Sequence, residues 1–303
     1  MRIAVTGRNG QIVQSLVERA AAAKIDLHTV ARPELDLTRP ETVEVALMVL
    51  RPDAIVNAAA YTDVDLAESE PSLVYRINEK GAEAAARAAA KLAIPIVQLS
   101  TDYVFDGNLD RPYRETDPTN PLGVYGCSKL AGERAVAIAN DNHVILRTAW
   151  AYSPFSRNFA RTMLALAREQ RQLSVVGDQR GTPTCAFDIA DGIITAIRNL
   201  LDRPSAQELR GIFHMTGGGE TNWAAFATAI LTASAAVGGP SARVIPISTA
   251  EYPTTVRRPA NSRLDNSRLA DLHGICLPHW QQSLQGCIDR IVAASASIDV
   301  SVG

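Results

Sequence analysis

The chain has 303 residues, of which 47% are hydrophobic and 20% are charged, and its formal net charge is −2. These values are typical of a globular protein. Without a basic excess or an apolar run of roughly 18 residues, they indicate neither a nucleic-acid partner nor a membrane span. The chain starts with a strand-like run, RIAV, in place of a basic leader and apolar signal core, so we expect a cytoplasmic protein.

Apolar runs alternate with helical stretches over the first half of the chain. The pattern predicts strands at 2–7, 25–31, 54–60, 94–100 and 143–150, and helices at 10–24, 41–50, 76–92 and 125–138. Strands that alternate with helices in this way pair in parallel through crossover helices. The strands lack a period of two, as expected of a sheet covered on both faces. We therefore expect an α/β fold with a doubly wound, Rossmann-like parallel sheet.

The alternation loosens after Trp150. The pattern predicts helices at 157–170 and 188–201, a short strand at 173–176, a returning strand at 211–217, and mostly helix from Thr221 onward. We expect residues 1–150 to form a dinucleotide-binding domain, which some segments of 170–220 rejoin. Residues 151–303 would form most of a smaller, discontinuous and mainly helical substrate-binding domain.

Gly7 and Gly10 lie between the first predicted strand and the first predicted helix. Glycines in this turn let the backbone approach a pyrophosphate, whose charge is stabilised by the helix N-terminus. A third glycine is expected three residues later, but the chain has Val13 there. The first helix must then pack slightly farther from the sheet or shift. The turn indicates a dinucleotide cofactor, although a bare strand–turn–helix also explains two glycines.

Arginines flank the predicted adenosine end of this site. Arg32 follows the second predicted strand, where an acidic residue would favour NAD, and Arg8 lies in the glycine turn. Two guanidinium groups suit a 2′-phosphate, which favours NADPH and leaves NADH open. The alternative is that both arginines are merely solvated. Asp36 could contact the adenine or the ribose.

The segment YGCSK places Tyr125 and Lys129 four residues apart on one helical face. If this face borders a cleft, the ammonium lowers the pKa of the phenol and Tyr125 becomes a poised acid. Taken alone, the motif more often marks a solvated surface pair. Thr101 ends a central strand, at the sheet edge where ligands bind in open α/β folds. Thr101, Tyr125 and Lys129 therefore form a candidate catalytic group. The four cysteines form no C-x-x-C clip, and no metal site is predicted.

Seven further segments carry a family resemblance. They are NAAAYTDVDLAESEP (57–71), STDYVFDG (100–107), NPLGVYGCSKLAGE (120–133), RTAWAY (147–152), NFARTML (158–164), DQRGTPT (178–184) and RRPANSRLD (257–265). With the glycine turn, they resemble the extended short-chain dehydrogenase/reductase superfamily and, within it, the dTDP-4-dehydrorhamnose reductase family. The resemblance runs from about residue 1 to residue 290.

The resemblance implies a reaction and the roles of three residues. The enzyme would reduce the C4 keto group of dTDP-4-dehydro-L-rhamnose with NADPH or NADH, giving dTDP-L-rhamnose for lipopolysaccharide biosynthesis. Tyr125 would be the general acid, and Thr101 would hydrogen-bond the same sugar oxygen. Lys129 would hold the nicotinamide ribose and, together with the charge of the oxidised ring, lower the pKa of the tyrosine.

The resemblance also implies binding residues. Those for the cofactor are Gly7, Gly10, Gln11, Ile12, Arg32, Asp36, Leu37, Ala60, Tyr61 and Thr62, with Tyr125 and Lys129. Those for the sugar nucleotide are Thr62, Thr101, Asp102, Tyr103, Trp150, Arg258 and Asn261, with Arg257 beside the diphosphate. For Trp150 alone, core packing is an alternative, as is a solvated loop for the arginines. Some relatives form a magnesium-linked dimer through a carboxylate where this chain has Ser15, so a homodimer is compatible with the family and the metal is not predicted.

Two other interpretations stay open. Another nucleotide-sugar enzyme, such as a 4-epimerase or a reductase of a different deoxysugar, would share most of these motifs. A non-catalytic regulatory subunit on the same fold would bind NADP without turnover. The presence of Thr101, Tyr125 and Lys129 argues against such a subunit, whereas Val13 keeps it open.

Overall fold

In the computed structural model, the backbone of residues 1–300 and the side chains of residues 1–294 are described. Within this part of the chain, the largest sheet has six parallel strands in the order β10-β5-β4-β3-β1-β2. The strands are β1 (Arg2–Thr6), β2 (Asp26–Val30), β3 (Ala54–Asn57), β4 (Ile96–Thr101), β5 (His143–Thr148) and β10 (Gly211–His214). The chain passes from β1 to β2 and then crosses to the other side of β1 for β3, so the topology switches between β1 and β3. The predicted fold class is confirmed.

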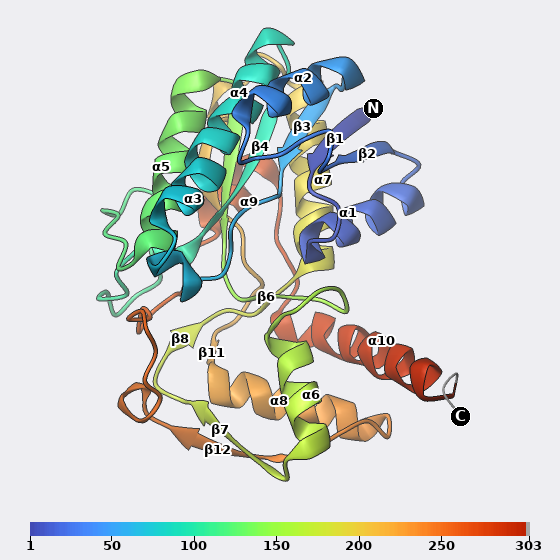
Figure 1. Ribbon diagram of the computed structural model, residues 1–303, viewed down its shortest axis with the longest axis vertical. Coiled ribbons are helices and arrows are strands. Elements are labelled where there is room, and N and C mark those ends of the chain that lie inside the picture. The colour runs from blue at the N-terminus through green and yellow to red at the C-terminus, as the bar shows by residue number, and fades with distance from the viewer. Residues whose placement is uncertain (301–303) are drawn as a thin grey trace.

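Helices cover both faces of this sheet (Figure 1). One face carries α1 (Gln11–Ala22) and α7 (Ala186–Asp202), and the other carries α2 (Pro40–Leu50), α4 (Ala82–Lys91) and α5 (Val124–Ala139). Alternate side chains of β1 point to opposite faces of the sheet, and the apolar ones on both faces are buried by helices. Ile3 and Val5 belong to the core cluster beneath α1 and α7, whereas Ala4 belongs to the cluster beneath α2 and α4.

A smaller unit lies below the carboxyl edge of the sheet in Figure 1. Its elements are α6 (Phe159–Glu169), α8 (Trp223–Ala236), α10 (Trp280–Val300) and the parallel pair β7 (Gln172–Val176) and β12 (Arg243–Ile247). They enclose a core of their own. The segments α7 and β10 pack with the large sheet, so the chain crosses between the units several times. Residues 301–303 of the predicted substrate domain lie outside the described residues.

Short elements connect these parts. They are β6 (Ala151–Tyr152), β8 (Arg180–Gly181), β9 (Thr184–Cys185), β11 (Thr221–Asn222), α3 (Pro71–Tyr75), α9 (Ser267–His273) and the short helices η1 (Leu66–Glu68), η2 (Arg76–Gly81), η3 (Asp102–Val104), η4 (Gln207–Leu209) and η5 (Thr249–Glu251). No helix in the described part of the chain is long and apolar enough to cross a membrane.

The helix predicted at 76–92 differs from the observed one. It begins earlier, as α3 at Pro71, then passes through six π-helical residues, η2, and continues as α4. The reason is a close crossing with α5, where a methyl group at Gly132 would lie 2.2 Å from the carbonyl oxygen of Asn78. The wider turn at Asn78 accommodates this contact.

Candidate functional site

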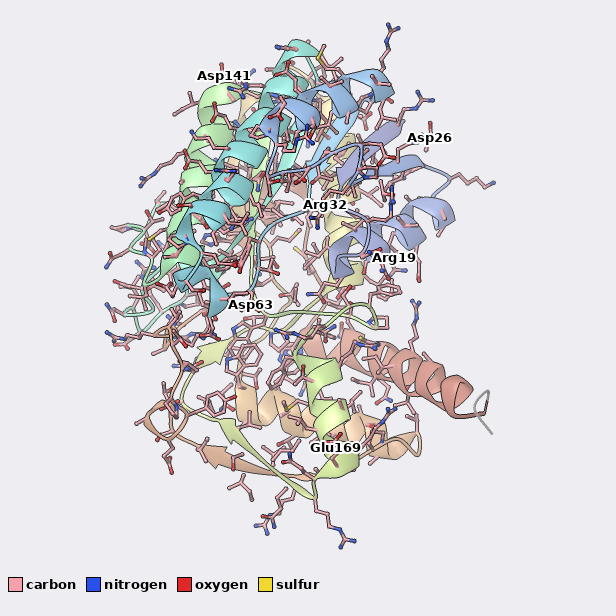
Figure 2. All side chains as sticks on the ribbon, in the orientation of Figure 1. Arg19, Asp26, Arg32, Asp63, Asp141 and Glu169 are labelled. Atoms are coloured by element: carbon pink, nitrogen blue, oxygen red, sulfur yellow. The ribbon has the colours of Figure 1, made fainter. Side chains whose placement is uncertain are left out.

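The carboxyl ends of the parallel strands meet at one edge of the sheet, and the loops that follow them face the smaller unit. In Figure 2, Asp63 of the loop after β3 lies where the two units meet, and Arg32 of the loop after β2 lies within the larger unit. This is the edge at which open α/β sheets bind ligands. It is also the edge that carries the predicted site residues.

A cavity of about 370 Å³ lies at the topological switch point. It is lined by Gly7, Arg8, Asn9, Ala31, Arg32, Leu35, Asp36, Leu37, Thr38, Ala59, Ala60 and Ile77. Gly7 has a φ of +97°, and a methyl group there would lie 3.2 Å from Cβ of Ala59. Only glycine suits this turn. The structure thus brings five of the predicted cofactor residues to one cavity, namely Gly7, Arg32, Asp36, Leu37 and Ala60.

Charges of both signs surround this cavity. The Asp36 carboxylate accepts hydrogen bonds from the backbone N–H and the hydroxyl of Thr38, at 2.9 and 2.8 Å. These bonds, together with Arg32 and Arg39, hold the pKa of Asp36 below its usual range. A nitrogen of Arg8 lies 3.9 Å from a carboxylate oxygen of Glu34, with both side chains exposed. The cavity therefore offers an ionised carboxylate and two guanidinium groups.

The N-terminus of α1 follows Gly10, which caps the helix without a side chain. Its first backbone N–H groups are thus available to an anion. The side chain of Gln11 donates to the carbonyl oxygen of Ala151 at 3.2 Å and accepts from the hydroxyl of Ser153 at 3.2 Å. Gln11 therefore ties the glycine turn to the segment that enters the smaller unit.

Val13 occupies the position of the missing glycine. It is 2% exposed and belongs to the core cluster beneath α1. Its Cγ2 atom would lie 3.5 Å from a methyl group at Gly7, an ordinary contact distance. Valine is thus packed into the core while the glycine turn keeps its positive φ. Ile12 packs partly against the same cluster.

The candidate catalytic group assembles where β4 ends and α5 begins. The hydroxyl of Thr101 donates to Oδ1 of Asp102 at 3.0 Å and accepts from the backbone N–H of Tyr103 at 3.2 Å. The rings of Tyr125 and Tyr103 contact edge to face, with centroids 5.7 Å apart. One helical turn after Tyr125, Nζ of Lys129 donates to the carbonyl oxygen of Leu99 in β4 at 2.7 Å.

In this structure Lys129 is not among the groups that shift the pKa of Tyr125. Burial raises the pKa of Tyr125 above its ordinary value, and hydrogen bonding with Thr101 acts in the opposite direction. Lys129 is only 5% exposed, and burial lowers its own pKa to about 8, against the attraction of Glu133. Desolvation of each group therefore outweighs any influence of the ammonium on the phenol.

Asp102 is buried and Tyr103 half-buried beside this group. Burial raises the pKa of Asp102 to about 6, against hydrogen bonds with Ser262 and Thr101. Among the described residues, its Oδ2 atom has no hydrogen-bond partner. Burial also raises the pKa of Tyr103 to about 12. The guanidinium of Arg258 lies 5.9 Å from the Tyr103 ring centre and donates to Oδ2 of Asp65 at 2.5 Å.

A second cavity, of about 900 Å³, is lined by residues of both units. Asp65 and Tyr103 come from the larger unit, and Phe159, Trp223 and Arg258 lie on segments after residue 150. Its walls thus combine aromatic rings with a guanidinium. Trp150 is not among the lining residues, but its indole stacks on that of Trp223 with ring centroids 3.6 Å apart.

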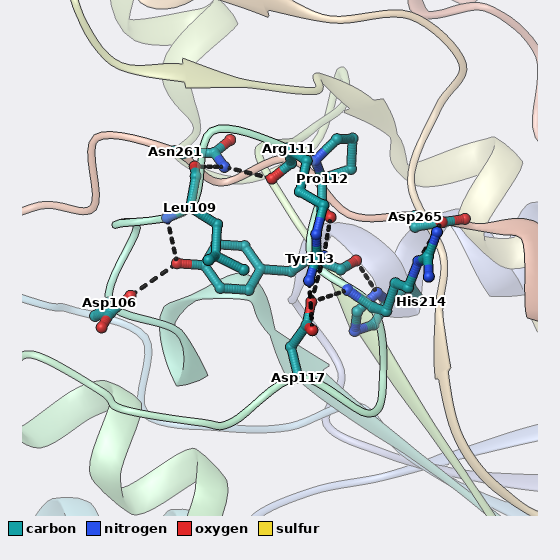
Figure 3. A network of polar contacts seen from close by, with 10 residues as sticks. Asp106, Leu109, Arg111, Pro112, Tyr113, Asp117, His214, Asn261 and Asp265 are labelled. Atoms are coloured by element: carbon teal, nitrogen blue, oxygen red, sulfur yellow. Dashed lines mark hydrogen bonds and ion pairs between the residues drawn. The ribbon is translucent and has the colours of Figure 1, made fainter.

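Two predicted residues have other contacts in this structure, and a third is exposed. Asn261 donates to the carbonyl oxygens of Leu109 and Arg111 at 2.6 and 2.8 Å (Figure 3). Its Oδ1 accepts from Arg263. It therefore braces the loop after β4. The phenol of Tyr61 donates to Glu70 at 2.8 Å, and its pKa is raised to about 12, chiefly by desolvation. Thr62 is exposed.

Two residues that the sequence analysis did not select support the site. Asn78 is 3% exposed; its amide exchanges hydrogen bonds with the backbone of Tyr61 and donates to the hydroxyl of Ser128 at 3.0 Å. It thereby joins the loop after β3 to α5. Glu68 accepts from the backbone N–H of Val124 at 2.7 Å, at the start of α5. A polar residue within an alanine-rich helix is the only sequence signal for Asn78.

Comparisons of sequence and structure with known proteins agree on one family. The family model for the RmlD substrate binding domain matches residues 1–293. A dTDP-4-dehydrorhamnose reductase of Sinorhizobium fredii is 50% identical over 283 residues, covering 93% of this chain and 95% of the relative. The structure is similar to the dTDP-4-dehydrorhamnose reductase of Clostridium acetobutylicum (TM-score 0.86, 35% identity, 95% and 99% of the two chains). It is equally similar to that of Bacillus anthracis, solved in complex with NADP (TM-score 0.86, 33% identity, 95% and 98%).

Proposed function

The chain belongs to the RmlD family of dTDP-4-dehydrorhamnose reductases, and on that premise we propose how its residues carry the reaction. The enzyme reduces the C4 keto group of dTDP-4-dehydro-L-rhamnose to give dTDP-L-rhamnose, with NADPH as cofactor. The observation that carries the residue assignment is the meeting of Thr101, Tyr125 and Lys129 at the end of β4. The loop that follows β4 contributes Tyr103 to the cavity between the units.

The first cavity fits the adenosine end of the cofactor. Its glycine turn and the uncapped start of α1 suit a pyrophosphate, because backbone N–H groups and the helix dipole favour an anion there. Arg32 and Arg8 would take the 2′-phosphate, and Asp36 would bind a ribose or adenine group. When bound, NADPH supplies a hydride to the C4 carbon of the sugar.

Tyr125 would supply the proton that the reduced oxygen needs. As C4 gains the hydride, negative charge develops on the keto oxygen, and the O–H bond of Tyr125 breaks while a new O–H bond forms on the sugar. Because burial keeps the phenol protonated at neutral pH, the acid is present before the substrate arrives. Thr101 would orient the sugar oxygen. Lys129 would bind the nicotinamide ribose and, while charged, stabilise the phenolate left on Tyr125.

The second cavity would hold the sugar nucleotide. Its volume of about 900 Å³ lies within the range of small-molecule sites, which combine apolar walls with a few polar groups. Arg258 would pair with the diphosphate, for which a guanidinium is well suited. Asp102 and Trp150 would contact the hexose. Asn261 is the weakest of the predicted substrate ligands, because its amide already donates hydrogen bonds to the carbonyl oxygens of Leu109 and Arg111.

The decisive experiment follows the loss of NADPH absorbance with dTDP-4-dehydro-L-rhamnose and identifies the C4 configuration of the product. We expect Tyr125→Phe to lower kcat by about 10²- to 10⁴-fold while the Kd of NADPH changes less than about two-fold. Tyr75→Phe is the matched control, since Tyr75 lies on α3 and its hydroxyl contacts Cys127, whereas that of Tyr125 contacts Thr101. A Tyr125→Phe enzyme with the parent rate would refute the assignment of the acid.

The same assay separates the other interpretations. An epimerase would retain NAD and show no net NADPH oxidation, and a regulatory subunit would bind NADPH without turnover of any keto sugar. We also propose that the enzyme works in the cytoplasm, where NADPH and nucleotide sugars are made. Its product would serve lipopolysaccharide biosynthesis. A homodimer is compatible with the family, and light scattering of the purified protein tests it.

A further inference from the structure

Glu133 places a buried carboxylate on α5, one helical turn after Lys129. Glu133 and Arg147 of β5 are each 2% exposed, and Nε and Nη2 of the guanidinium donate to the two carboxylate oxygens at 2.9 and 2.7 Å. The hydroxyl of Ser100 in β4 donates to one of the same oxygens. Three hydrogen bonds therefore hold this carboxylate in place and join α5 to both β4 and β5.

The position of this ion pair links it to the catalytic group. Nζ of Lys129 donates to the carbonyl oxygen of Leu99, the residue before Ser100, so consecutive residues of β4 bond consecutive turns of α5. Residues four apart on a helix are neighbours on one face. Lys129 and Glu133 thus lie on the same buried face of α5 and carry opposite charges.

A buried ion pair adds little to stability, because both ions lose their hydration. Replacing such a pair by apolar side chains of similar volume is often neutral or stabilising, whereas removing one partner leaves an unpaired buried charge and is strongly destabilising. Stability alone therefore does not account for a charged pair beneath α5, and the neighbouring lysine offers a role for it.

Burial and Glu133 act on Lys129 in opposite directions. Lys129 is 5% exposed, and burial favours its neutral form, which lowers its pKa to about 8. The negative charge of Glu133 favours the ammonium and raises the pKa against this burial. Arg147 is not among the groups that shift the pKa of Lys129, although it pairs with the same carboxylate. Without Glu133, the lysine would lose its charge at a lower pH.

Further charged and titratable groups lie on α5 and on the elements packed against it. They include Tyr125 on α5 itself, Asp102 and Tyr103 in η3, Glu68 in η1, Tyr75 in α3, Glu79 and Lys80 in η2, and Glu83 and Arg87 in α4. Asp102 accepts from Thr101, Glu68 accepts from the backbone of Val124, and both cations donate to Glu83. None of these groups is among those that shift the pKa of Lys129.

We propose that Glu133 is a positioning residue of the catalytic group, which keeps Lys129 in its ammonium form by placing an opposite charge one helical turn away. Ser100 and Arg147 serve the same role indirectly, because they fix the carboxylate. The relation between Glu133 and Lys129 rests on the contacts of α5 with β4 and β5. Its consequence for the reaction rests on the proposed function, in which the ammonium binds the nicotinamide ribose.

NMR of the lysine side chains measures the charge of Lys129 directly. The chain has four lysines, so a protein labelled with ¹³C at the lysine Cε gives four signals, and Lys129→Arg identifies that of Lys129 by its loss. In the cofactor-free wild type, this signal should titrate with a midpoint at a pH of about 8. In Glu133→Gln/Arg147→Met, we expect the midpoint to fall by roughly one pH unit, because the charge that opposes burial is gone.

The double variant is chosen so that the protein folds and the shift has one cause. Glu133→Gln alone would leave the Arg147 guanidinium buried without its carboxylate, whereas methionine replaces it with an apolar side chain. Loss of a positive charge near Lys129 can only raise its pKa, so the second substitution cannot produce the expected fall. Glu133→Asp keeps the charge and should restore most of the midpoint. Glu83→Gln is the control, at a carboxylate that pairs with Arg87 on α4.

Binding of NADPH gives a second readout, for which turnover is not needed. At a pH of about 8, half of the wild-type lysine is charged, against roughly a tenth in the double variant if its midpoint is one unit lower. The Kd of NADPH, measured by protein fluorescence, should therefore be about five-fold higher in the double variant at this pH. About two pH units lower, both proteins carry the charge and should bind NADPH alike.

An unchanged Lys129 midpoint in the double variant would overturn the inference. So would a midpoint that falls as far in Glu133→Asp or in Glu83→Gln. A lower midpoint with an unchanged Kd of NADPH would support the role of Glu133 and refute the assignment of Lys129 to the nicotinamide ribose, so the inference and the proposed function fail on different results.

Discussion

At the scale of single residues, burial sets the ionisation of the two groups that handle the proton. It raises the pKa of Tyr125 and lowers that of Lys129 to about 8. The phenol therefore stays protonated throughout the neutral range. The ammonium, in contrast, begins to lose its charge on the alkaline side of neutrality. The free enzyme is thus arranged to donate a proton from Tyr125, and its alkaline pH dependence arises at Lys129.

The pH profile of kcat/KM for NADPH should report the ionisation of Lys129, because this ratio follows the free enzyme. Below a pH of about 8 the side chain is charged and can bind the nicotinamide ribose; above it the charge is lost, so kcat/KM should fall about tenfold per pH unit. Lys129→Arg should be slower at neutral pH but lack this alkaline limb, since a guanidinium stays charged. The same break in both profiles would show that another group titrates.

Arg32 should decide between the two nicotinamide cofactors. Arg32→Ala is expected to raise the Kd of NADPH about 10- to 100-fold, the value of hydrogen bonds to a charged group, and to change that of NADH less than about three-fold. Titration of protein fluorescence with each cofactor measures both constants. Arg87→Ala is the control, because Arg87 pairs with Glu83 on the surface of α4. Equal losses for both cofactors would contradict the 2′-phosphate role.

The residues of the site were predictable to different degrees, and the physical reason differs in each case. Tyr125 and Lys129 could be predicted from their spacing along a helix, and Thr101 from its position at the end of a buried strand. The local sequence pattern was enough for all three. The direction of the pKa shift of Tyr125 could not be predicted, because desolvation depends on every segment packed around the phenol. Trp223 and Asn78 act through contacts with segments distant in the chain, and nothing in their local sequence indicates those partners.

At the scale of elements, α1 shows how a departure from the glycine pattern is absorbed. Val13 faces the sheet and fills part of the core that a glycine would leave to its neighbours. The turn at Gly7 keeps its φ of +97°, and even a methyl group there would lie 3.5 Å from Cγ2 of Val13, an ordinary contact distance. The substitution is therefore expected to serve stability and to leave the pyrophosphate turn intact.

Val13→Gly should thus destabilise the protein without improving cofactor binding. We expect the free energy of unfolding to fall by roughly 2 to 4 kcal/mol, from lost burial, a cavity and the poor helix propensity of glycine. Val17→Gly, one turn later at a residue 43% exposed, should lose only about 1 kcal/mol. Denaturant unfolding and NADPH titration give both quantities. An unchanged stability with NADPH bound tenfold tighter would mean that valine obstructs the turn.

The strands and helices of the large sheet were predictable because their apolar runs are long and regular. Their ends were placed less well, as for the strand predicted at 54–60, which ends at Asn57 because the chain leaves the sheet for the ligand edge. The π-helical segment that follows α3 at Arg76 could not be read from the sequence, since it depends on the approach of α5 at Gly132. The strand β12 was missed because it contains Pro246 and pairs with one neighbour only.

At the scale of the whole molecule, two cores enclose a cavity that neither could form alone. The sheet unit supplies the cofactor turn and the catalytic group, and the smaller unit supplies the aromatic and guanidinium walls. The ion pair of Arg258 with Asp65 joins them across the cavity, and that of Arg290 with Glu18 joins α10 to α1 outside it. Arg258 could thus act on the substrate, on the closure of the units, or on both.

Substitutions at the two ion pairs separate these roles. If Arg258 binds the diphosphate, Arg258→Ala should raise the KM for the keto sugar about 10- to 100-fold and leave the Kd of NADPH unchanged. Asp65→Asn should not raise the KM, because it removes the competing carboxylate and frees the guanidinium for the substrate. Arg290→Ala breaks an exposed pair away from the cavity and should cost less than about 1 kcal/mol of stability with normal kinetics. A rise in KM for Asp65→Asn as large as that for Arg258→Ala would mean that the ion pair itself shapes the cavity, because only then does the loss of either partner have the same effect.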